Sequence, residues 1–576
     1  MFTLTEILSN KVSGIFESCG YSAKFGTVKV SDRPDLCQFQ CNGAFGAAKI
    51  YKKTPDVIAA DVVSKLLNDN SFEKVSVVGK GFINIDIADR FLLNYLQNTL
   101  SDSNLGIKQA ESSEIIFLDY GGPNAAKPLH VGHLRSAIIG DSLKRLVEAT
   151  GRKTISDVHL GDWGLQMGLV IAELEDRDNC GDEISLTSEE WDTVYAIASQ
   201  KSKLDEQFRK RAQEITVKFQ NGDKKYISVW EKIMKISIKS IKENYKVLGV
   251  DFDLWNGESD AEKYVPELIE TLEKGKLLEE SMGAKVVNVS LPEDSAPVPP
   301  VIIKKSNGSN IYATTDLATI IERNKLYHPD EMWYIVDSRQ NLYFTQIFRC
   351  ARKAVLVPKD TVLLHLCFGT MNGKDGKPYK TRDGGVMKLS DLYKTVYDIV
   401  YKRVRTSLYS KESDKQEISH KLAVAAIKFG DLINHRTKDY VFDIDKFTAS
   451  EGKTGIFLLY TISRINSILK KCGDNDDNLI DNVPNNIYSE TERKLILRLS
   501  LTNEMYETAF LEKAPNLICE NAYNIASAFS KFYSEIHIID EKDCNKKNSW
   551  LYLCKATKII LQKHLDILGI ESVEFM

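Results

Sequence analysis

The chain has 576 residues, of which 43% are hydrophobic and 27% are charged, which excludes an intrinsically disordered protein and, at this length, a single hydrophobic core. Its net charge of −4 excludes attraction to nucleic acid through overall charge, so any polyanion must be bound by local patches. The ten cysteines include no CxxC pair and no apolar run approaches the ~18 residues of a membrane span, so we expect a cytoplasmic protein without zinc and without a membrane partner.

Residues 1–110 are predicted to form a small α+β domain. Its expected elements are two helices followed by two strands, at Leu4–Cys19, Asp56–Asn68, Val75–Val78 and Phe82–Ile87. The polar stretch from Ser101 to Ser113 indicates the linker that ends the domain.

The most informative segment is the next one, Pro123–His133 (PNAAKPLHVGH). It joins an apolar strand predicted at Ile115–Asp119 to an amphipathic helix predicted from about Leu134 to Thr150. A helix amino terminus offers unpaired N–H groups and a partial positive charge, and the imidazoles of His130 and His133 add donors one turn apart. The pattern therefore predicts a phosphate site at the carboxyl end of a strand.

Two neighbouring residues support the phosphate interpretation. Gly132 lacks the side chain that would keep a nucleotide away from the backbone, and Lys127 adds positive charge. An isolated HxGH sequence is more often a pair of ordinary surface or core histidines. The strand before the motif, the helix after it and Lys127 reverse that preference here.

The rest of the chain divides into three predicted parts. Residues 111–390 alternate strands with helices, which predicts an α/β domain with a doubly wound, Rossmann-like parallel sheet; further strands are expected at Trp333–Asp337 and Val362–Phe368. A helical insertion at about 183–250 is rich in Lys, Glu and Gln, most simply a solvated face. Residues 391–440 are predicted to be a helical connector, and 441–576 an all-helical bundle.

The motif from His130 to His133 resembles the HIGH signature of class I aminoacyl-tRNA synthetases. Further motifs resemble arginyl-tRNA synthetases of the bacterial type: Asp119–Asn124 (DYGGPN), Lys127–His130, Gly161–Gly164 with Gln166, Tyr312–Asp316 (YATTD), Asp337–Gln340, Gly81–Ile85 and Leu568–Ile570. The resemblance extends over the whole chain. It implies a HIGH-type catalytic domain between an N-terminal domain associated with the tRNA elbow and an anticodon-binding bundle.

The resemblance implies activation of L-arginine by ATP with Mg²⁺, followed by transfer of the arginyl group to tRNA(Arg). We expect the protein to be a monomer. The chain lacks a KMSKS loop and has the degenerate sequence Gly376–Gly385 in its place. By resemblance the ATP-binding residues are His130, Gly132, His133, Lys127, Lys377, Lys380 and Arg382. The expected catalytic residues among them are His130, His133, Lys127, Lys380 and Arg382, and which residue of the loop reaches the phosphates stays open.

The arginine-binding residues implied by the resemblance are Asp119, Asn124, His133, Tyr312, Asp316 and Gln340, with Gln346 as an alternative to Gln340. Asp316 is expected directly after a strand at Ile311–Thr314, and a carboxylate there matches the planar guanidinium with paired hydrogen bonds. An isolated Asp at such a position is otherwise a helix N-cap. The tRNA-binding candidates are Phe39, Asn84, Tyr460, Arg464 and Met576, although most aromatic residues of the bundle are expected in its core.

Two other functions remain open at this point. One is a different HxGH adenylyltransferase or synthetase, but a small nucleotidyltransferase would not need a helical tail of this length. The other is a non-catalytic tRNA-binding paralogue, which would be free to lose Lys127, His130 or Gly132, and this chain retains all three.

Overall fold

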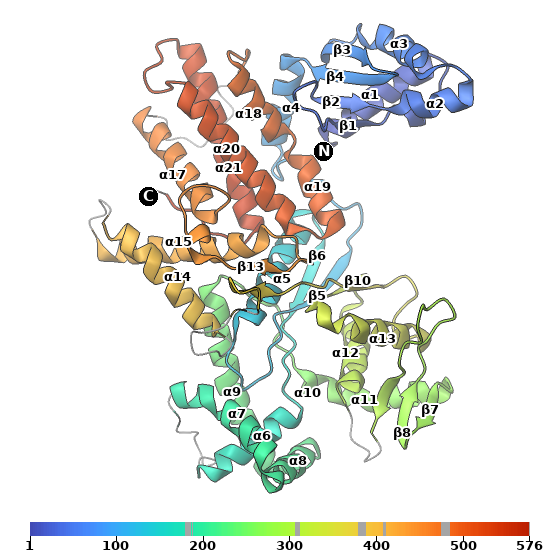
Figure 1. Ribbon diagram of the computed structural model, residues 1–576, viewed down its shortest axis with the longest axis vertical. Coiled ribbons are helices and arrows are strands. Elements are labelled where there is room, and N and C mark those ends of the chain that lie inside the picture. The colour runs from blue at the N-terminus through green and yellow to red at the C-terminus, as the bar shows by residue number, and fades with distance from the viewer. Residues whose placement is uncertain are drawn as a thin grey trace. The chain divides into compact units, whose positions relative to one another are not determined.

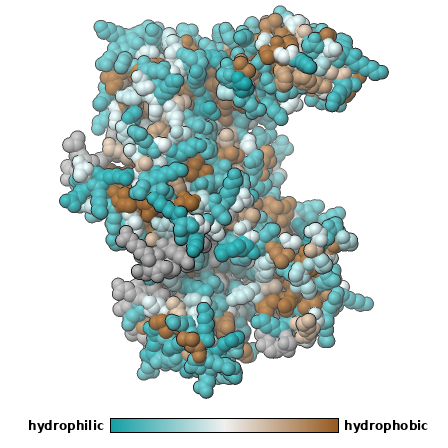
Figure 2. Space-filling model, viewed as in Figure 1, coloured by the Kyte–Doolittle hydropathy of each residue, from teal (hydrophilic) through white to brown (hydrophobic). Residues whose placement is uncertain are grey.

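A computed structural model describes residues 1–178, 186, 188–305, 311–377, 379, 387–406, 411–473, 484–574 and 576 (Figure 1). The chain forms two compact units: unit 1 comprises residues 1–109, 449–567 and 571–576, and unit 2 comprises residues 110–448 and 568–570. Hydrophilic and hydrophobic residues are interspersed over the face shown in Figure 2. No described helix is long and apolar enough to cross a membrane. The predicted four-domain division stays a prediction.

The amino-terminal part of unit 1 is an antiparallel sheet covered by helices. Its elements are α1 (Leu4–Ser18), β1 (Val28–Val30), β2 (Phe39–Cys41), α2 (Gly43–Tyr51), α3 (Pro55–Leu66), β3 (Phe72–Val78), β4 (Phe82–Ile87) and α4 (Asp89–Ser101), with strand order β1-β2-β4-β3. The predicted helices and strands are confirmed. The sequence missed β1 and β2 because three-residue strands give almost no periodic signal.

The carboxyl-terminal part of unit 1 is helical, as predicted. It contains α17 (Gly455–Lys471), α18 (Glu490–Ser500), α19 (Thr502–Glu512), α20 (Pro515–Glu535) and α21 (Cys544–Ile567). The predicted apolar stripe of α20 is buried. A buried polar contact joins three of these helices, because the imidazole of His564 lies 3.0 Å from both the Tyr506 hydroxyl and the Asn521 amide.

Unit 2 is built on a four-stranded parallel sheet with the order β11-β10-β5-β6. The strands are β5 (Ile115–Tyr120), β6 (Lys153–Asp157), β10 (Glu331–Ile335) and β11 (Val362–His365), connected through helices that include α5 (Val131–Ala149), α12 (Tyr312–Tyr327) and α13 (Asn341–Lys353). The chain leaves β5 toward β6 and leaves β10 toward β11, in opposite directions. This reversal confirms the doubly wound fold and opens a crevice at the carboxyl ends of β5 and β10.

The two faces of this sheet are covered by different helices. Strand side chains alternate between faces, and those of Phe117 and Met332 belong to one apolar cluster with residues of α12 and α13 such as Leu317 and Ile347. Helix α5 contacts β5, β6 and β10. Helices α14 (Leu389–Val404) and α15 (Glu412–Leu432) contact α5 in turn, so α5 lies buried between two layers.

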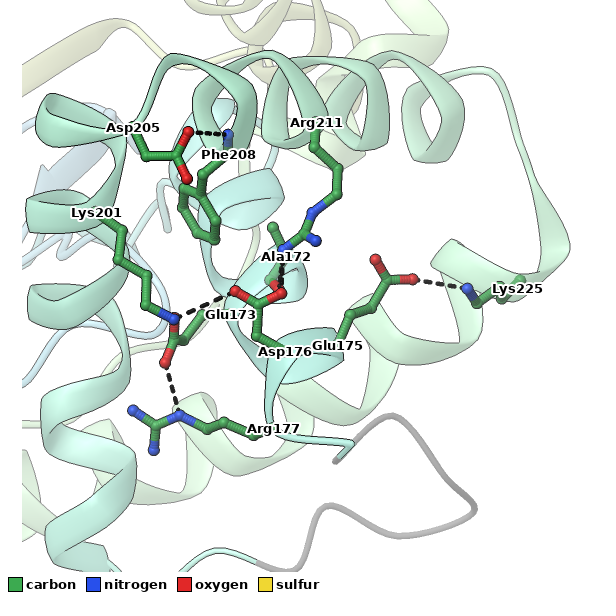
Figure 3. A network of polar contacts seen from close by, with 10 residues as sticks. All are labelled: Ala172, Glu173, Glu175, Asp176, Arg177, Lys201, Asp205, Phe208, Arg211 and Lys225. Atoms are coloured by element: carbon green, nitrogen blue, oxygen red, sulfur yellow. Dashed lines mark hydrogen bonds and ion pairs between the residues drawn. The ribbon is translucent and has the colours of Figure 1, made fainter.

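The region predicted as a helical insertion is helical over the residues that the structure describes, and charged side chains join its helices to α6 (Leu165–Asp176). Helix α6 presents carboxylates to α7 (Ser188–Leu204), α8 (Glu206–Gln220) and α9 (Lys224–Val247) (Figure 3). The contacts are Glu173 to Lys201 (2.6 Å) and to Arg177 (2.8 Å), Asp176 to Arg211 (2.5 Å) and Lys201 (3.2 Å), and Glu175 to Lys225 (2.7 Å). Part of the insertion's charge therefore holds its helices together rather than facing solvent alone.

The remaining described elements of unit 2 surround the sheet. They are α10 (Glu258–Ala261), α11 (Val265–Lys274), the antiparallel strands β7 (Leu278–Ser281), β8 (Ala284–Val287) and β9 (Val301–Lys304), the two-residue strands β12 (Met371–Asn372) and β13 (Tyr440–Val441), α16 (Ile444–Phe447), and the short 3-10 segments Glu262–Tyr264 and Ser338–Gln340. Strands β12 and β13 pair in parallel.

Two predicted boundaries in unit 2 are wrong. The strand expected at Ile311–Thr314 does not exist, because α12 begins at Tyr312. Ala313, Leu317 and Ile320 recur at helical spacing and are buried, which is the pattern of a helix rather than of a strand. Helix α5 begins at Val131, three residues before the predicted start, so His133 lies inside the helix.

The buried Arg135 of α5 ties the helix to the segments around β12 and β13. Its Nε lies 3.1 Å from the Asp431 carboxylate, and its Nη1 donates to the carbonyl oxygens of Gly369 (2.7 Å) and Lys438 (3.1 Å). Asp431 also accepts from the Tyr440 hydroxyl at 2.8 Å. Removing one partner of such a pair leaves an uncompensated buried charge.

We predict that Arg135→Met lowers the free energy of unfolding by about 3–5 kcal/mol, measured by urea titration. The same substitution at Arg339, whose side chain is 77% exposed in its pair with Asp337, is the matched control and should change stability little. The double variant R135M/D431N should recover part of the loss. Equal midpoints for R135M and R339M would show that the buried pair does not stabilise the unit.

Candidate active site

The two histidines of the HxGH motif form the amino-terminal cap of α5. His130 is the N-cap residue, and its Nδ1 accepts a hydrogen bond from the Gly132 backbone N–H at 3.0 Å. The Nδ1 of His133 accepts from the His130 backbone N–H at 3.1 Å. The rings are stacked with centroids 3.9 Å apart. This is a capping box in which imidazoles replace the usual Ser and Glu side chains.

This cap fixes the tautomer of both rings. An Nδ1 that accepts a hydrogen bond carries no proton, so each neutral imidazole carries its proton on Nε2. Burial lowers the pKa of His133 to about 3, with further lowering by His130 and Lys127, and burial and Lys127 lower the pKa of His130. Both rings are therefore neutral Nε2–H donors at pH 7.

The expectation of unpaired backbone N–H groups at this helix terminus is wrong. His130 and Gly132 donate to the two imidazoles, Val131 donates to the Met387 carbonyl (3.1 Å), and His133 donates to the His130 carbonyl (2.8 Å). The imidazoles accept two of these four hydrogen bonds and present their own Nε2–H groups to the cavity. The side chains, rather than the backbone, offer the hydrogen bonds to an anion.

Gly132 and Lys127 lie beside this pair in different ways. A Cβ atom at Gly132 would lie 2.8 Å from the Cε1 atom of His130, so this glycine preserves the position of the ring as well as access to the backbone. The Lys127 ammonium lies 4.2 Å from the centre of the Tyr195 ring of α7. Lys127 does not line the pocket described next, although its charge acts on both histidines.

A cavity of about 690 Å³ opens at the carboxyl ends of β5 and β10 and has the histidine pair in its wall. Its wall includes every predicted arginine-binding residue, the predicted ATP-binding residues His130 and Gly132, and several residues that were not predicted. Together these are Asp119, Asn124, His130, Gly132, His133, His159, Glu258, Tyr312, Asp316, Arg323, Gln340 and Tyr343. All six predicted arginine ligands therefore meet in one cavity with the predicted phosphate donors.

One buried guanidinium organises the floor of this cavity. Arg323 of α12 is 2% exposed, and its Nη2 lies 2.7 Å from the Asp119 carboxylate and 2.9 Å from that of Asp157. Its plane lies over the rings of Phe117 and Tyr334. One oxygen of Asp119 is therefore already engaged by the protein.

Two further carboxylates face the cavity without a cationic partner from the described residues within ion-pairing distance. Asp316 accepts a hydrogen bond from the Tyr343 hydroxyl, and burial raises the pKa of this carboxyl group. Glu258, the first residue of α10, is 8% exposed. Burial, and then the charge of Asp316, raise the pKa of Glu258 to about 8. A cationic ligand beside these two carboxyl groups would favour their ionised forms and so lower their raised pKa values.

His159, just beyond β6, supplies positive charge between these acids. Its Nδ1 lies 3.5 Å from Asp157. Although burial acts to lower it, the contact with Asp157 raises the pKa of His159 to about 9. When the four carboxylates Asp119, Asp157, Glu258 and Asp316 are ionised, they outnumber the two cations His159 and Arg323. The cavity therefore has a negative excess suited to a ligand with two cationic groups.

The other predicted arginine ligands lie at the rim. Tyr312 is 52% exposed and its hydroxyl lies 3.1 Å from the Gln166 amide oxygen. Asn124 forms a parallel bridge with Gly161. Gln340 is exposed and lines the cavity, whereas the Gln346 amide donates to the Pro299 carbonyl at 2.7 Å and does not line it. The geometry favours Gln340 over Gln346.

The loop predicted to replace KMSKS is described only in part. Lys377 is exposed and does not line the cavity; its backbone N–H donates to Asp375 at 3.1 Å. Lys380 and Arg382 lie outside the described residues.

Three of the predicted tRNA-binding residues gather on one surface of unit 1. The Arg464 guanidinium donates to the Tyr460 hydroxyl at 2.7 Å and lies 5.4 Å from the centre of the Tyr533 ring. The backbone N–H of Met576 donates to Ser463, the neighbour of Arg464, at 2.7 Å. Tyr460 is 40% exposed and Met576 is 38% exposed. These side chains offer stacking surfaces to a partner.

The two candidates in the amino-terminal sheet are placed differently. Phe39 has no exposed surface, and Asn84 is 7% exposed with its amide oxygen accepting from Gln40 at 2.9 Å. We correct the assignment of Phe39 as a tRNA contact, because a residue in the core of this sheet presents no surface to RNA. Asn84 is chiefly a cross-strand partner of Gln40.

The sequence reasoning missed His159, Glu258 and Arg323. His159 comes two residues after the carboxyl end of β6, a position where ligand-binding residues concentrate in such folds, so its place in the chain could have indicated it. Glu258 and Arg323 gave no such signal. Their side chains reach the cavity only because α10 and α12 pack at its edge.

Three protein-family models together match most of the chain. Residues 95–444 match "tRNA synthetases class I (R), catalytic domain", residues 3–87 match "Arginyl tRNA synthetase N terminal domain", and residues 458–576 match "DALR anticodon binding domain". The first of these matches alone covers more than half of the chain.

Individual relatives agree over the full length. The chain is 46% identical to an arginine–tRNA ligase of Alkaliphilus oremlandii and 43% identical to one of Agathobacter rectalis, with 100% of each chain covered. Among solved structures it resembles arginyl-tRNA synthetase of Plasmodium falciparum, with 25% identity and a TM-score of 0.84, and that of Thermus thermophilus, with 18% identity and a TM-score of 0.79; both comparisons cover 100% of both chains. The Thermus structure bears on the fold alone.

The capping geometry predicts the protonation of both motif histidines. Nitrogen-15 NMR of histidine-labelled protein should show neutral Nε2–H imidazoles for His130 and His133 from pH 7 to 8, with assignment by His130→Asn and His133→Gln. His133 should not titrate in this range, because its pKa is lowered to about 3. His328, an exposed residue whose imidazole takes no part in the site, is the internal control. A protonated Nδ1 on either ring at pH 7 would contradict the geometry.

Proposed function

The chain belongs to the arginyl-tRNA synthetase family, and from this premise we propose that it activates L-arginine with ATP and transfers the arginyl group to tRNA(Arg). The observation that carries the proposal is the shared cavity at the carboxyl ends of β5 and β10. Neutral imidazole donors and a pocket with excess carboxylate lie in the same wall. A phosphate group and a guanidinium can be bound there side by side.

In the first step a carboxylate oxygen of arginine attacks the α-phosphorus of ATP and forms a new phosphorus–oxygen bond. The bond from the α-phosphorus to the oxygen that bridges to the β-phosphate breaks, and pyrophosphate leaves. The carboxylate is ionised at pH 7, so no general base is needed. The step needs alignment and donors for charge that grows on phosphate oxygens. We assign His130 and His133 to this task through their Nε2–H groups, and Mg²⁺ enters with the ATP phosphates.

Selection of arginine follows from the carboxylates that lack an internal partner. We assign Asp316 and Glu258 to the guanidinium, because a planar five-donor cation matches paired carboxylate oxygens. Asp119 and Asp157 hold Arg323, which fixes the floor of the pocket. An uncharged analogue would leave Asp316 and Glu258 buried without a partner, and lysine cannot reproduce the planar fork. Asn124, Tyr312 and Gln340 complete the arginine site at the rim.

In the second step the arginyl group passes to the terminal ribose of tRNA(Arg), and AMP leaves. Lys127 and the loop residues Lys377, Lys380 and Arg382 are proposed to neutralise the nucleotide phosphates. Tyr460, Arg464 and Met576 are proposed to contact the tRNA through the helical part of unit 1. A monomeric state and a cytoplasmic location complete the proposal and rest on sequence reasoning.

The proposal predicts charging of tRNA(Arg) by arginine and by none of the other nineteen amino acids, measured as aminoacyl-tRNA formed in the presence of ATP and Mg²⁺. Glu258→Gln and Asp316→Asn should raise the KM for arginine at least about a hundredfold, because each leaves a charge uncompensated in the complex. The KM for ATP should stay within about twofold. Glu279→Gln, at an exposed position of β7, is the matched control. Charging with lysine or glutamine but not arginine would overturn the proposal.

The raised pKa of Glu258 predicts pH-dependent arginine binding. The pKa of this group is about 8 without ligand, and a bound guanidinium favours its ionised form. Below pH 8 arginine must therefore displace a proton, so affinity should rise by up to about tenfold per pH unit from pH 6 to 8 and level off above. His159 does not contribute in this window, because it stays protonated below pH 9.

Calorimetry in two buffers of different ionisation enthalpy would count the protons released at pH 7. In Glu258→Gln the release should fall and the pH dependence flatten; titration of arginine itself is common to both proteins and cancels. No proton release by the wild-type protein at pH 7 would show that Glu258 does not meet the ligand.

A further inference from the structure

Helix α9 carries a stripe of lysines that the site described above does not use. Its 24 residues include seven lysines and two glutamates, in a chain whose net charge is −4. Lys235, Lys239, Lys242 and Lys246, which we call the α9 lysine stripe, recur at intervals of three and four residues. They share one face of the helix over about 17 Å.

The stripe is exposed and forms no ion pair with the residues that the structure describes. All four residues are exposed, and together with Ile238 and Glu243 they line a shallow surface groove. Within the described ranges, none of the four ammonium groups lies within ion-pairing distance of a carboxylate. Lys242 alone has a defined neighbour, the Trp255 ring, whose centre lies 4.7 Å away. This differs from Lys201, Arg211 and Lys225, which pair with the acids of α6 (Figure 3).

The opposite face of α9 is attached to the active-site loop. Tyr245 donates its hydroxyl proton to the Gly121 carbonyl, and the Ala126 backbone N–H donates to Ser237 at 3.0 Å. The Trp230 indole donates to the Asp162 carbonyl at 2.9 Å. Gly121 lines the cavity that contains the histidine pair. A polyanion bound along the stripe would therefore lie about one helix diameter, roughly 10 Å, from the loop that shapes the site.

We propose that the α9 lysine stripe binds the phosphate backbone of the acceptor arm of tRNA. This inference rests on the proposed function and names the surface through which the aminoacylated end is held. A ladder of unpaired ammonium groups complements a line of phosphates. The acceptor arm is the part of the tRNA whose end must reach the cavity, and no other arm has to approach this loop. Binding is electrostatic and independent of base sequence.

The test uses an RNA hairpin that contains the acceptor and T arms and lacks the anticodon arm. Three full-length proteins are compared: the wild type, K235Q/K239Q/K242Q/K246Q, and the control K274Q/K276Q/K285Q/K359Q, which removes four exposed lysines elsewhere in unit 2. The stripe variant should bind the hairpin at least about tenfold more weakly at ~0.1 M salt, and its slope of log Kd against log salt should fall by about 3. The control should match the wild type.

Arginine binding, measured by calorimetry, should be equal in all three proteins, which shows that the cavity is intact. Equal salt slopes for the stripe variant and the control would overturn the inference. Loss of binding to anionic lipid vesicles with unchanged hairpin binding would also overturn it and assign the stripe to a membrane surface. If the wild type does not charge tRNA(Arg), the proposed function fails. If the wild type charges tRNA(Arg) normally but the stripe variant and the control have equal salt slopes, only this inference fails.

Discussion

The shape of the catalytic cavity depends on one guanidinium held between two carboxylates. Arg323 of α12 bridges Asp119 at the end of β5 and Asp157 at the end of β6, so it fixes a helix and two strands at the same point. Arg323 and the protonated His159 balance the charges of Asp119 and Asp157, so the negative excess of the cavity comes from Glu258 and Asp316 when these are ionised. The carboxylates that are neutralised within the protein and those left to bind a cationic ligand therefore belong to one cluster of interacting charges.

The phosphate side of the cavity follows an opposite principle. Burial and the nearby Lys127 keep His130 and His133 neutral, so these rings do not add positive charge beside the carboxylates. They act as oriented dipoles that carry the favourable potential of the α5 amino terminus into the cavity. In the proposed function, cation binding and phosphate binding are thereby kept from neutralising each other, although the residues assigned to them share one wall.

The sequence predicted what depends on local patterns and missed what depends on packing. The strand–turn–helix around His130, the doubly wound topology and the apolar stripe of α20 follow from periodicity and motif spacing, and the structure has them. Asp316 was predicted to lie directly after a strand, whereas it lies on α12, from which it lines the cavity. Glu258 and Arg323 were not found, because burial among other charges gives a side chain its role there and a single sequence does not display that environment.

The double use of the motif histidines constrains how this site can change. Each imidazole closes the first turn of α5 and also supplies a donor to the cavity. A duplicated copy released from selection for chemistry would still need a capped helix at this place. Drift should then favour Asn, Ser or Asp at position 130, which preserve the cap, over Ala, which does not. Copies that have lost the catalytic role but kept the fold should therefore have helix-capping residues at position 130.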